Sequence, residues 1–314
     1  MKSNNFDGNK FINLTPPVEK KTFLRFLKWR FQTEKQKWPE WVEIKQSKPK
    51  YPKIEQNINV IFINHATMLI QMDGINILTD PVYSKRTSPI SFMGPKRVKL
   101  PGVRFEDLPK IDIILISHNH YDAFDVNTLD RLILRDNPKI LFGIGNGFYL
   151  NEKDPKNVIE MNWGDEFAFK KIKFTFLPNQ HWSKRNLSDT NKSLWGSFAI
   201  EGSRKIYFAG DTGYSNHFKN IQEKFNYFDL SLIPIGAYEP RWFMKYNHMN
   251  PEDAVKAHMD LNSKKSIGIH FGTFQLTNEK IDDPIRDLAK ARSKYYVDQK
   301  DFFTLKEGEE LMIK

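Results

Sequence analysis

The sequence predicts a mixed α/β domain over residues 51–314, preceded by an N-terminal extension over residues 1–50 that contains a basic amphipathic helix. From Ile54 onward, short runs rich in β-branched residues are separated by turn residues. Strand-like runs then alternate with helical stretches, which is typical of α/β domains. We find no internal repeat or low-complexity linker within this region. A chain of 314 residues is also long enough to bury a substantial core.

The N-terminal extension has the pattern of an amphipathic helix within residues 17–45. Apolar side chains at helical spacing lie opposite basic ones. Two interpretations remain open. The helix lies at a membrane interface with its aromatic residues at the headgroups, or it packs its apolar side on the main domain. The apolar residues are Phe23, Leu24, Leu27 and Phe31, and the basic ones are Lys21, Arg25 and Lys28.

The main domain begins with the strand-like runs INVIFIN, MLIQM and INILTDP. Gly74, between the second and the third, predicts a hairpin turn. Helical spacing predicts helices over Val126–Arg135 and Pro251–Leu261. We expect Asn250 to be the N-cap of the later helix, with Pro251 at its first position.

The composition limits the chemistry and the location of the protein. Cysteine is absent, which excludes disulfides, thiolate zinc sites and cysteine nucleophiles and leaves His, Asp and Glu as metal ligands. The first residues, MKSNNFDGNKF, lack the apolar region of a secretory signal, so we expect a cytoplasmic protein. The apolar runs are far shorter than the roughly 20 residues that span a bilayer.

The charge of the chain indicates an anionic partner. A net charge of +10 and an isoelectric point near 9.4 favour nucleic acid or an anionic lipid surface, unless the lysines only solvate the surface. We find no RNP-like strand, glycine-rich phosphate loop or helix-turn-helix signature. We therefore expect no nucleic-acid partner.

Residues suited to metal binding follow an apolar run that begins at Asp112. His118, His120 and Asp122 come directly after this run. Side chains at positions i and i+2 of an extended segment point the same way. His118 and His120 can therefore bind one cation together, with Asp122 nearby as an oxygen ligand.

Three more strand-like runs lead to a histidine or an aspartate, namely His181, Asp211 and His270. A single such residue is more often a cap or a hydrogen-bonded loop residue than a ligand. Four coincidences favour a shared site, because strand ends at one edge of a sheet converge. Imidazole and carboxylate suit zinc, iron or manganese, and the expected chemistry is hydrolysis.

The segment HNHYDAFD is similar to the HxHxDH signature of metallo-β-lactamase-fold hydrolases. The wider sequence resembles the N-acylphosphatidylethanolamine-hydrolysing phospholipases D, from about Phe6 nearly to the C-terminus. The resemblance implies an αββα sandwich, in which two mixed sheets pack face to face with helices outside. It rests on segments that include LPNQHWSKR, FAGDTGYS, KKSIGIHFGTFQLTNE and, the most specific, EPRWFMKYNHMNPEDAV.

The resemblance also implies two zinc ions. One would be bound by three histidines, the other by an aspartate and a histidine, with a second aspartate as the bridge between them. Both aspartates would also be catalytic residues. The implied ligands are His118, His120 and His181 for the first ion, Asp122 and His270 for the second, and Asp211 for the bridge.

Four further residues take roles from the resemblance. Tyr121 and His248 match positions that contact the phospholipid substrate. Without the resemblance we would interpret them as a packed tyrosine and a hydrogen-bonded loop histidine. Asp80 and His65 match positions beside the metal pocket, where a carboxylate can fix the tautomer of a ligand. Their ordinary alternatives are a turn aspartate before a proline and a core histidine.

Ala123 departs from the family pattern, which has histidine at this position. Alanine cannot bind metal, so the second ion would keep Asp122, Asp211 and His270 but lose an imidazole. Either the second site is weak or empty, or the alanine is an engineered substitution. Water or the substrate phosphate could also complete the site.

The leading expectation is hydrolysis of N-acylphosphatidylethanolamine to N-acylethanolamine and phosphatidic acid. The implied partners are this phospholipid and an anionic membrane surface bound peripherally, and a homodimer is compatible with the sequence. A lactonase or another small-molecule hydrolase is the alternative, because this fold hosts many activities. A catalytically weak lipid-binding protein is a third possibility, suggested by Ala123 and the basic helix.

Overall fold

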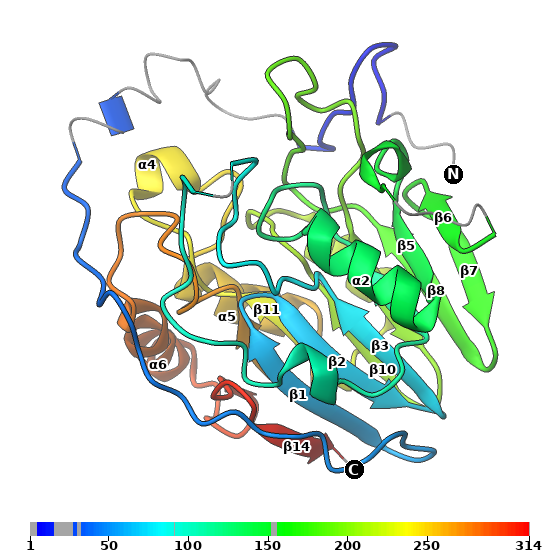
Figure 1. Ribbon diagram of the computed structural model, residues 1–314. Coiled ribbons are helices and arrows are strands. Elements are labelled where there is room, and N and C mark those ends of the chain that lie inside the picture. Colours follow the sequence, from blue (N-terminus) through cyan, green and yellow to red (C-terminus); the bar gives the residue numbers. More distant parts are fainter. Residues whose placement is uncertain (1–4, 16–27, 30–32, 91, 152–155, 314) are drawn as a thin grey trace.

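The computed structural model describes residues 5–15, 28–29, 33–90, 92–151 and 156–313 (Figure 1). Most of the predicted amphipathic helix lies outside these residues. Its described part, Lys28 and Trp29, is helical. The division of the chain at residue 50 stays a prediction.

Two seven-stranded sheets pack face to face and form the centre of the molecule (Figure 1). Both sheets contain parallel and antiparallel pairs. The first sheet has the order β14 (Glu310–Ile313), β1 (Ile58–Asn64), β2 (Thr67–Met72), β3 (Ile75–Thr79), β4 (Ile113–Leu115), β5 (Lys139–Gly143) and β6 (Val158–Met161). The second has the order β13 (Phe302–Phe303), β12 (Ser266–Ile269), β11 (Leu230–Pro234), β10 (Lys205–Phe208), β9 (Ser197–Glu201), β8 (Ile172–Leu177) and β7 (Glu166–Phe169).

Helices cover the outer faces of the two sheets, which confirms the predicted αββα sandwich (Figure 1). One helix packs on the first sheet, and three lie against the second. The described helices are α2 (Val126–Asp136) on the first sheet, α3 (His217–Phe225), α5 (Pro251–Asp260) and α6 (Asp283–Tyr295) on the second, and the short α4 (Arg241–Met244), η1 (Phe105–Asp107) and η2 (Gly147–Tyr149).

Strand β1 shows why the inner strands are apolar on both sides. Successive side chains of a strand point to opposite faces. Val60 and Phe62 belong to the core shared with the second sheet, whereas Ile61 and Ile63 pack with residues of α2 such as Leu129. A strand that is buried on both faces has a nearly continuous apolar sequence, as the run VIFI of β1 does.

Local signals in the sequence are confirmed at two places. Asp73 and Gly74 have φ angles of 51° and 72° in the turn between β2 and β3, as a two-residue type I′ hairpin requires. Helix α5 begins at Pro251, and the Asn250 side chain accepts a hydrogen bond from the backbone N–H of Asp253 at 2.9 Å. Helices α2 and α5 begin at the predicted residues, and the C-terminal end of each differs from the prediction by one residue.

The strand directions place several strand ends together. In the first sheet β1, β3 and β4 run parallel to one another, because β1 and β3 are both antiparallel to β2. In the second sheet β8, β10 and β12 are likewise parallel. The residues that follow these six strands can therefore meet at one edge of the sandwich.

The Asp125 carboxylate anchors the loop that carries the first metal motif. It caps α2 by accepting from the Thr128 backbone N–H at 3.4 Å, and the Thr128 hydroxyl also donates to it at 2.6 Å. It accepts from the Ser84 backbone N–H and hydroxyl at 2.8 Å each. The Tyr83 backbone N–H also donates to it, at 3.1 Å. One buried carboxylate therefore joins the start of α2 to the loop after β3.

We predict that Asp125→Ala lowers the free energy of unfolding by about 3 kcal/mol, because it removes a helix cap and leaves buried donors unpaired. Urea denaturation measures the change. Asn127→Ala, at an exposed position of the same helix, should change it by less than about 0.5 kcal/mol. Equal effects of the two substitutions would contradict this role for Asp125.

Candidate metal centre

The loops after six strands bring the six predicted ligands, and the two residues predicted beside them, together at one edge of the sandwich. Three loops follow strands of the first sheet, and three follow strands of the second. The residues are His65 after β1, Asp80 after β3, His118, His120 and Asp122 after β4, His181 after β8, Asp211 after β10 and His270 after β12.

His118, His120 and His181 form the first cluster, and their ligand atoms lie within 4.8 Å of one another. His181 Nε2 is 3.2 Å from His120 Nδ1. The His118 ring lies nearly perpendicular to the other two, with both centroids 4.6 Å away. Three protonated imidazoles would repel one another at these distances, whereas neutral imidazoles can approach this closely. Neutral imidazole is also the form that binds metal.

Hydrogen bonds on the far side of the rings orient two of these histidines. His181 Nδ1 donates to the Asn247 carbonyl at 3.0 Å, which leaves Nε2 as an acceptor. His118 Nδ1 lies 2.8 Å from the Ser117 hydroxyl, which lies 2.6 Å from the Asp80 carboxyl group. Asp80 therefore acts on His118 through Ser117. Burial raises the pKa of this carboxyl well above its usual range.

Asp122, His270 and His65 form the second cluster. Asp122 Oδ2 is 3.3 Å from His270 Nε2 and 3.2 Å from His65 Nε2. Sequence reasoning expected His65 beside the pocket, and the structure places it directly against a predicted ligand.

Asp211 lies between the two clusters. Its side chain is buried, and one carboxylate oxygen faces histidines of both groups. The Asp211 Oδ2 atom is 3.1 Å from His270 Nε2, 3.7 Å from His118 Nε2, 3.9 Å from His181 Nε2 and 4.0 Å from His248 Nδ1.

The protonation of the centre follows from burial and from these pairs. Burial lowers the pKa of His118 to about 3, so this imidazole is neutral. Burial would lower the pKa of His270 too, but the carboxylates of Asp211 and Asp122 raise it to about 10. Burial would raise the pKa values of these two carboxyls, but His270 holds both well below the usual range.

The residues present fit a divalent cation. Among the described residues, His118 Nε2 has no hydrogen-bond partner, although it is buried and faces Asp211. A buried polar atom without a partner is costly unless something binds it. Nitrogen and carboxylate oxygen donors suit zinc, iron or manganese, and the donor set does not distinguish them.

Comparison with known proteins gives the family. The model of the family "Beta-lactamase superfamily domain" matches residues 75–271. N-acyl-phosphatidylethanolamine-hydrolyzing phospholipase D 1 of Caenorhabditis elegans is 41% identical over 271 residues, which cover 81% of this chain and 76% of that protein. The chain belongs to the N-acylphosphatidylethanolamine-hydrolysing phospholipase D family of the metallo-β-lactamase superfamily. Members of this family are metal-dependent hydrolases, and so is this chain.

Two further comparisons agree with this family and fold. The mitochondrial N-acyl-phosphatidylethanolamine-hydrolyzing phospholipase D of Saccharomyces cerevisiae is 37% identical over 224 residues, which cover 69% of this chain and 48% of that protein. The metallohydrolase Igni18 of Ignicoccus hospitalis has the same fold, with a TM-score of 0.61 and 19% identity over 82% of this chain and 99% of that one.

In this phospholipase D family member, the two predicted substrate contacts lie next to predicted ligands, Tyr121 between His120 and Asp122 in the sequence and His248 beside His181. His248 packs against His181, with ring centroids 5.1 Å apart. The Tyr121 hydroxyl donates to the Arg185 carbonyl at 3.0 Å, and the Arg185 guanidinium lies over the Tyr121 ring at 4.1 Å. Their contact with substrate stays a prediction.

Asn13 is a supporting residue that the motif search missed. Its side-chain amide donates to the His181 carbonyl at 2.8 Å and accepts from the His181 backbone N–H at 3.2 Å. The N-terminal segment therefore helps to hold a predicted ligand in place. The only signal for this was that the family resemblance already begins at about Phe6.

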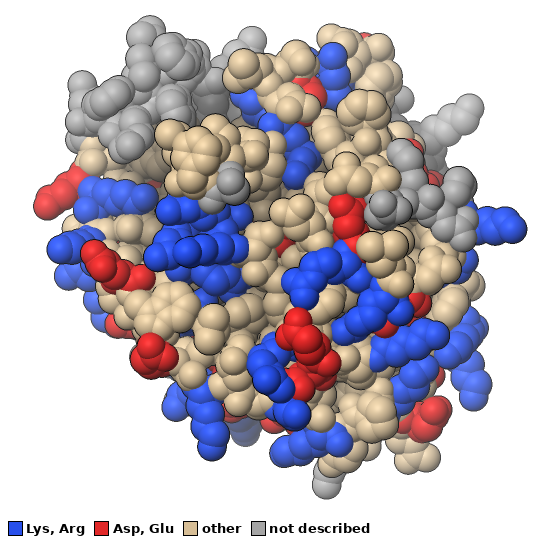
Figure 2. All heavy atoms as spheres, in the orientation of Figure 1, with Lys and Arg blue, Asp and Glu red and all other residues tan. Residues whose placement is uncertain are grey.

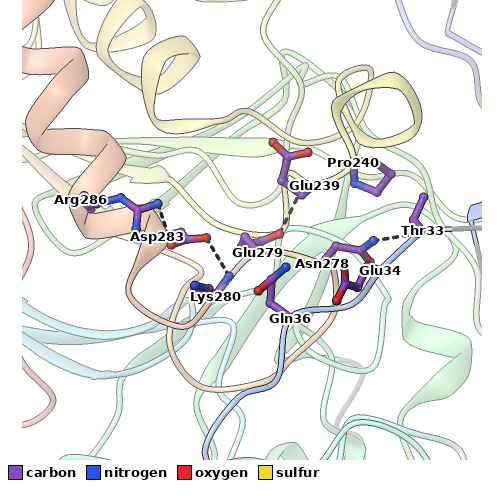
Figure 3. A pocket seen from close by; sticks show the side chains of 10 residues that line it. All are labelled: Thr33, Glu34, Gln36, Glu239, Pro240, Asn278, Glu279, Lys280, Asp283 and Arg286. Carbon is purple, nitrogen blue, oxygen red and sulfur yellow. Dashed lines mark hydrogen bonds and ion pairs between the residues drawn. The ribbon is translucent and has the colours of Figure 1, made fainter.

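A hollow in the surface lies away from the predicted ligands (Figure 3). It has a volume of about 550 Å³. Most of the charged residues that line it are acidic, namely Glu34, Glu239, Glu279 and Asp283. None of the predicted ligands lies in its wall.

We predict that Ser117→Ala lowers the affinity for the ion at the three histidines roughly 10–100-fold, because His118 loses the group that orients it. Zinc titration against a competing chelator measures this affinity. Ser231→Ala removes another buried hydroxyl, which bonds Ser263 instead, and should leave metal affinity unchanged. Unchanged affinity in Ser117→Ala would contradict the orienting role.

Proposed function

We propose that the chain hydrolyses N-acylphosphatidylethanolamine to N-acylethanolamine and phosphatidic acid in a zinc-dependent reaction. The observation that supports this most strongly is the pair of ligand clusters that meet at Asp211. The 41% identity to a phospholipase D named for this substrate supports the choice of reaction.

Two metal ions would be held by the two clusters. His118, His120 and His181 would bind one ion, and Asp122 and His270 the other, with Asp211 between them. When bound, paired ions lower the pKa of water and neutralise charge on phosphoryl oxygens.

The carboxylates of the centre serve as fixed acceptors. The pKa values of Asp122 and Asp211 are held well below the usual range, so both remain ionised at neutral pH. An ionised carboxylate can orient a water molecule or an imidazole N–H, but it cannot supply a proton to the leaving group. Over the whole reaction, the proton that the departing ethanolamine oxygen gains is balanced by one that the attacking water loses.

The phosphodiester would lie beside His248 and Tyr121. His248 is partly buried against Asp211 and can donate a hydrogen bond to a phosphoryl oxygen. Tyr121 is partly exposed at the edge of the same site. Water adds to phosphorus, the bond from phosphorus to the N-acylethanolamine oxygen breaks, and that oxygen leaves protonated.

A peripheral membrane contact would give access to the lipid substrate. No helix among the described residues is long and apolar enough to cross a bilayer. Figure 2 shows many lysines and arginines on one face, with fewer acidic groups between them. We propose that the basic residues of the N-terminal extension bind anionic headgroups, as Lys and Arg near such a surface do.

The described part of the predicted helix, Lys28 and Trp29, contacts the domain. The Trp29 ring stacks on Phe243 of α4 with centroids 5.3 Å apart, and its N–H donates to the Asn278 side chain at 3.2 Å. Lys28 Nζ lies 5.5 Å from the centroid of the Trp242 ring. These two residues therefore pack on the domain, which agrees with the interpretation that the helix packs its apolar side there.

We predict that His118→Ala and His181→Ala each reduce turnover by more than about 100-fold, because losing a ligand costs more than losing a supporting group. Release of N-acylethanolamine from lipid vesicles, followed by mass spectrometry, measures turnover. His258→Ala removes a buried histidine that bonds Ser266, and should affect stability rather than turnover. Full turnover in the ligand variants would refute the metal assignment.

We predict that replacing Lys21, Arg25 and Lys28 together by Gln weakens binding to anionic vesicles by about 100-fold at low salt, at about 1 kcal/mol per charge. Substitution is preferable to deletion, because Asn13 supports His181. Vesicle co-sedimentation at two salt concentrations measures the effect.

The matched control replaces Lys264, Lys265 and Lys300 by Gln. Lys264 and Lys265 directly precede β12, and the Lys265 ammonium donates to the Lys300 carbonyl. All three therefore lie near the end of β12 that is opposite His270. Equal binding by both triple variants would show that the extension does not bind the membrane.

A further inference from the structure

The second cluster contains an imidazole that the motif around Ala123 does not supply. His65 is only 1% exposed, and its Nε2 atom is 3.2 Å from Asp122 Oδ2. Its ring lies beside the His270 ring, with centroids 4.0 Å apart. Two imidazoles and a carboxylate therefore face one another on the side of the centre where Ala123 brings only a methyl group.

The spacing of these atoms matches a metal site. Ligands at 2.0–2.1 Å from a tetrahedral ion lie about 3.3 Å from one another. In the second cluster, Asp122 Oδ2 is 3.2 Å from His65 Nε2 and 3.3 Å from His270 Nε2. Asp211 Oδ2 is 3.1 Å from His270 Nε2. The first cluster has the same spacing, 3.2 Å between His181 Nε2 and His120 Nδ1.

The backbone holds His65 firmly in this place. Its N–H donates to the Thr273 hydroxyl at 3.0 Å, and its carbonyl accepts from the His270 N–H at 2.7 Å. Both histidines have left-handed backbones, with φ angles of 48° and 61°. Residues other than glycine adopt this conformation at a cost, and such strain gathers at functional sites. The backbones of the two histidines are therefore held next to each other.

A simpler role is a hydrogen bond from His65 to Asp122 that only orients the carboxylate, as the sequence resemblance implies. The 3.2 Å separation allows that bond as well. The two roles differ in one measurable quantity, because an orienting residue affects how Asp122 is held, whereas a ligand determines how many ions the chain retains.

We propose that His65 is a ligand of the second ion, together with Asp122, His270 and Asp211. It supplies an imidazole in place of the last histidine of the HxHxDH signature, which Ala123 replaces in this chain. The inference rests on the proposed two-ion centre, but it does not depend on which substrate the protein hydrolyses.

Metal content tests this proposal without reference to activity. The full-length protein is equilibrated with zinc in excess of two equivalents, unbound zinc is removed by gel filtration, and zinc per chain is measured by elemental analysis. We expect two ions in the unsubstituted chain, one in His65→Ala and two in the control His258→Ala. We also expect the absorption of the cobalt-substituted protein to lose the contribution of one site in His65→Ala.

His65→Asn separates loss of the ligand from loss of fold. Asparagine tolerates a left-handed backbone but brings no imidazole. We expect this variant to melt like the unsubstituted chain and to retain one ion. Two ions retained in either His65 variant would overturn the proposal.

Restoring a histidine at position 123 gives the sharpest comparison. In the His65→Ala background, Ala123→His should return the content from one ion to two, whereas in the unsubstituted chain it should change nothing. If Ala123→His alone raises the content from one to two, the second site lacks a ligand and His65 is not one. A chain that retains two ions but releases no N-acylethanolamine would instead refute the proposed reaction and leave this inference intact.

Discussion

The structure depends on one buried carboxylate, Asp211, which faces four imidazoles from other loops. Such a charge is costly to bury unless it is paired or binds a cation. In the structure His270 provides the nearest partner, and the other imidazoles lie at distances where an ion can fit between them and the carboxylate. Around this group the two sheets bring six loops together.

The sandwich meets this requirement through strand direction. Parallel strands in each sheet end at the same edge, so chemistry can be added to their loops without disturbing the core. The loops are then fixed by hydrogen bonds behind the ligands, for example from His181 to the Asn247 carbonyl. Asn13 and Asp125 hold two of these loops to distant parts of the chain. The rigidity of the centre thus comes from residues that bind neither metal nor substrate.

Local patterns in the sequence predicted a mixed α/β domain and candidate ligands that the structure brings together, and the family resemblance predicted the αββα sandwich. Apolar runs show buried strands, and polar residues directly after them show where the site lies. The partnership of His65 with Asp122 could not be predicted in this way, since it depends on how the loop after β1 meets the loop after β4, two strands that are not neighbours in the first sheet. Asn13 was missed for the same reason, because no local pattern indicates a contact between residues 168 positions apart.

Anomalous X-ray diffraction at the zinc edge, from crystals of the zinc-loaded protein, tests the central claim most directly. We predict two peaks, one on each side of Asp211. One would lie among His118, His120 and His181, and the other among Asp122, His270 and His65. A single peak at the three histidines, with His65 only hydrogen-bonded to Asp122, would contradict it.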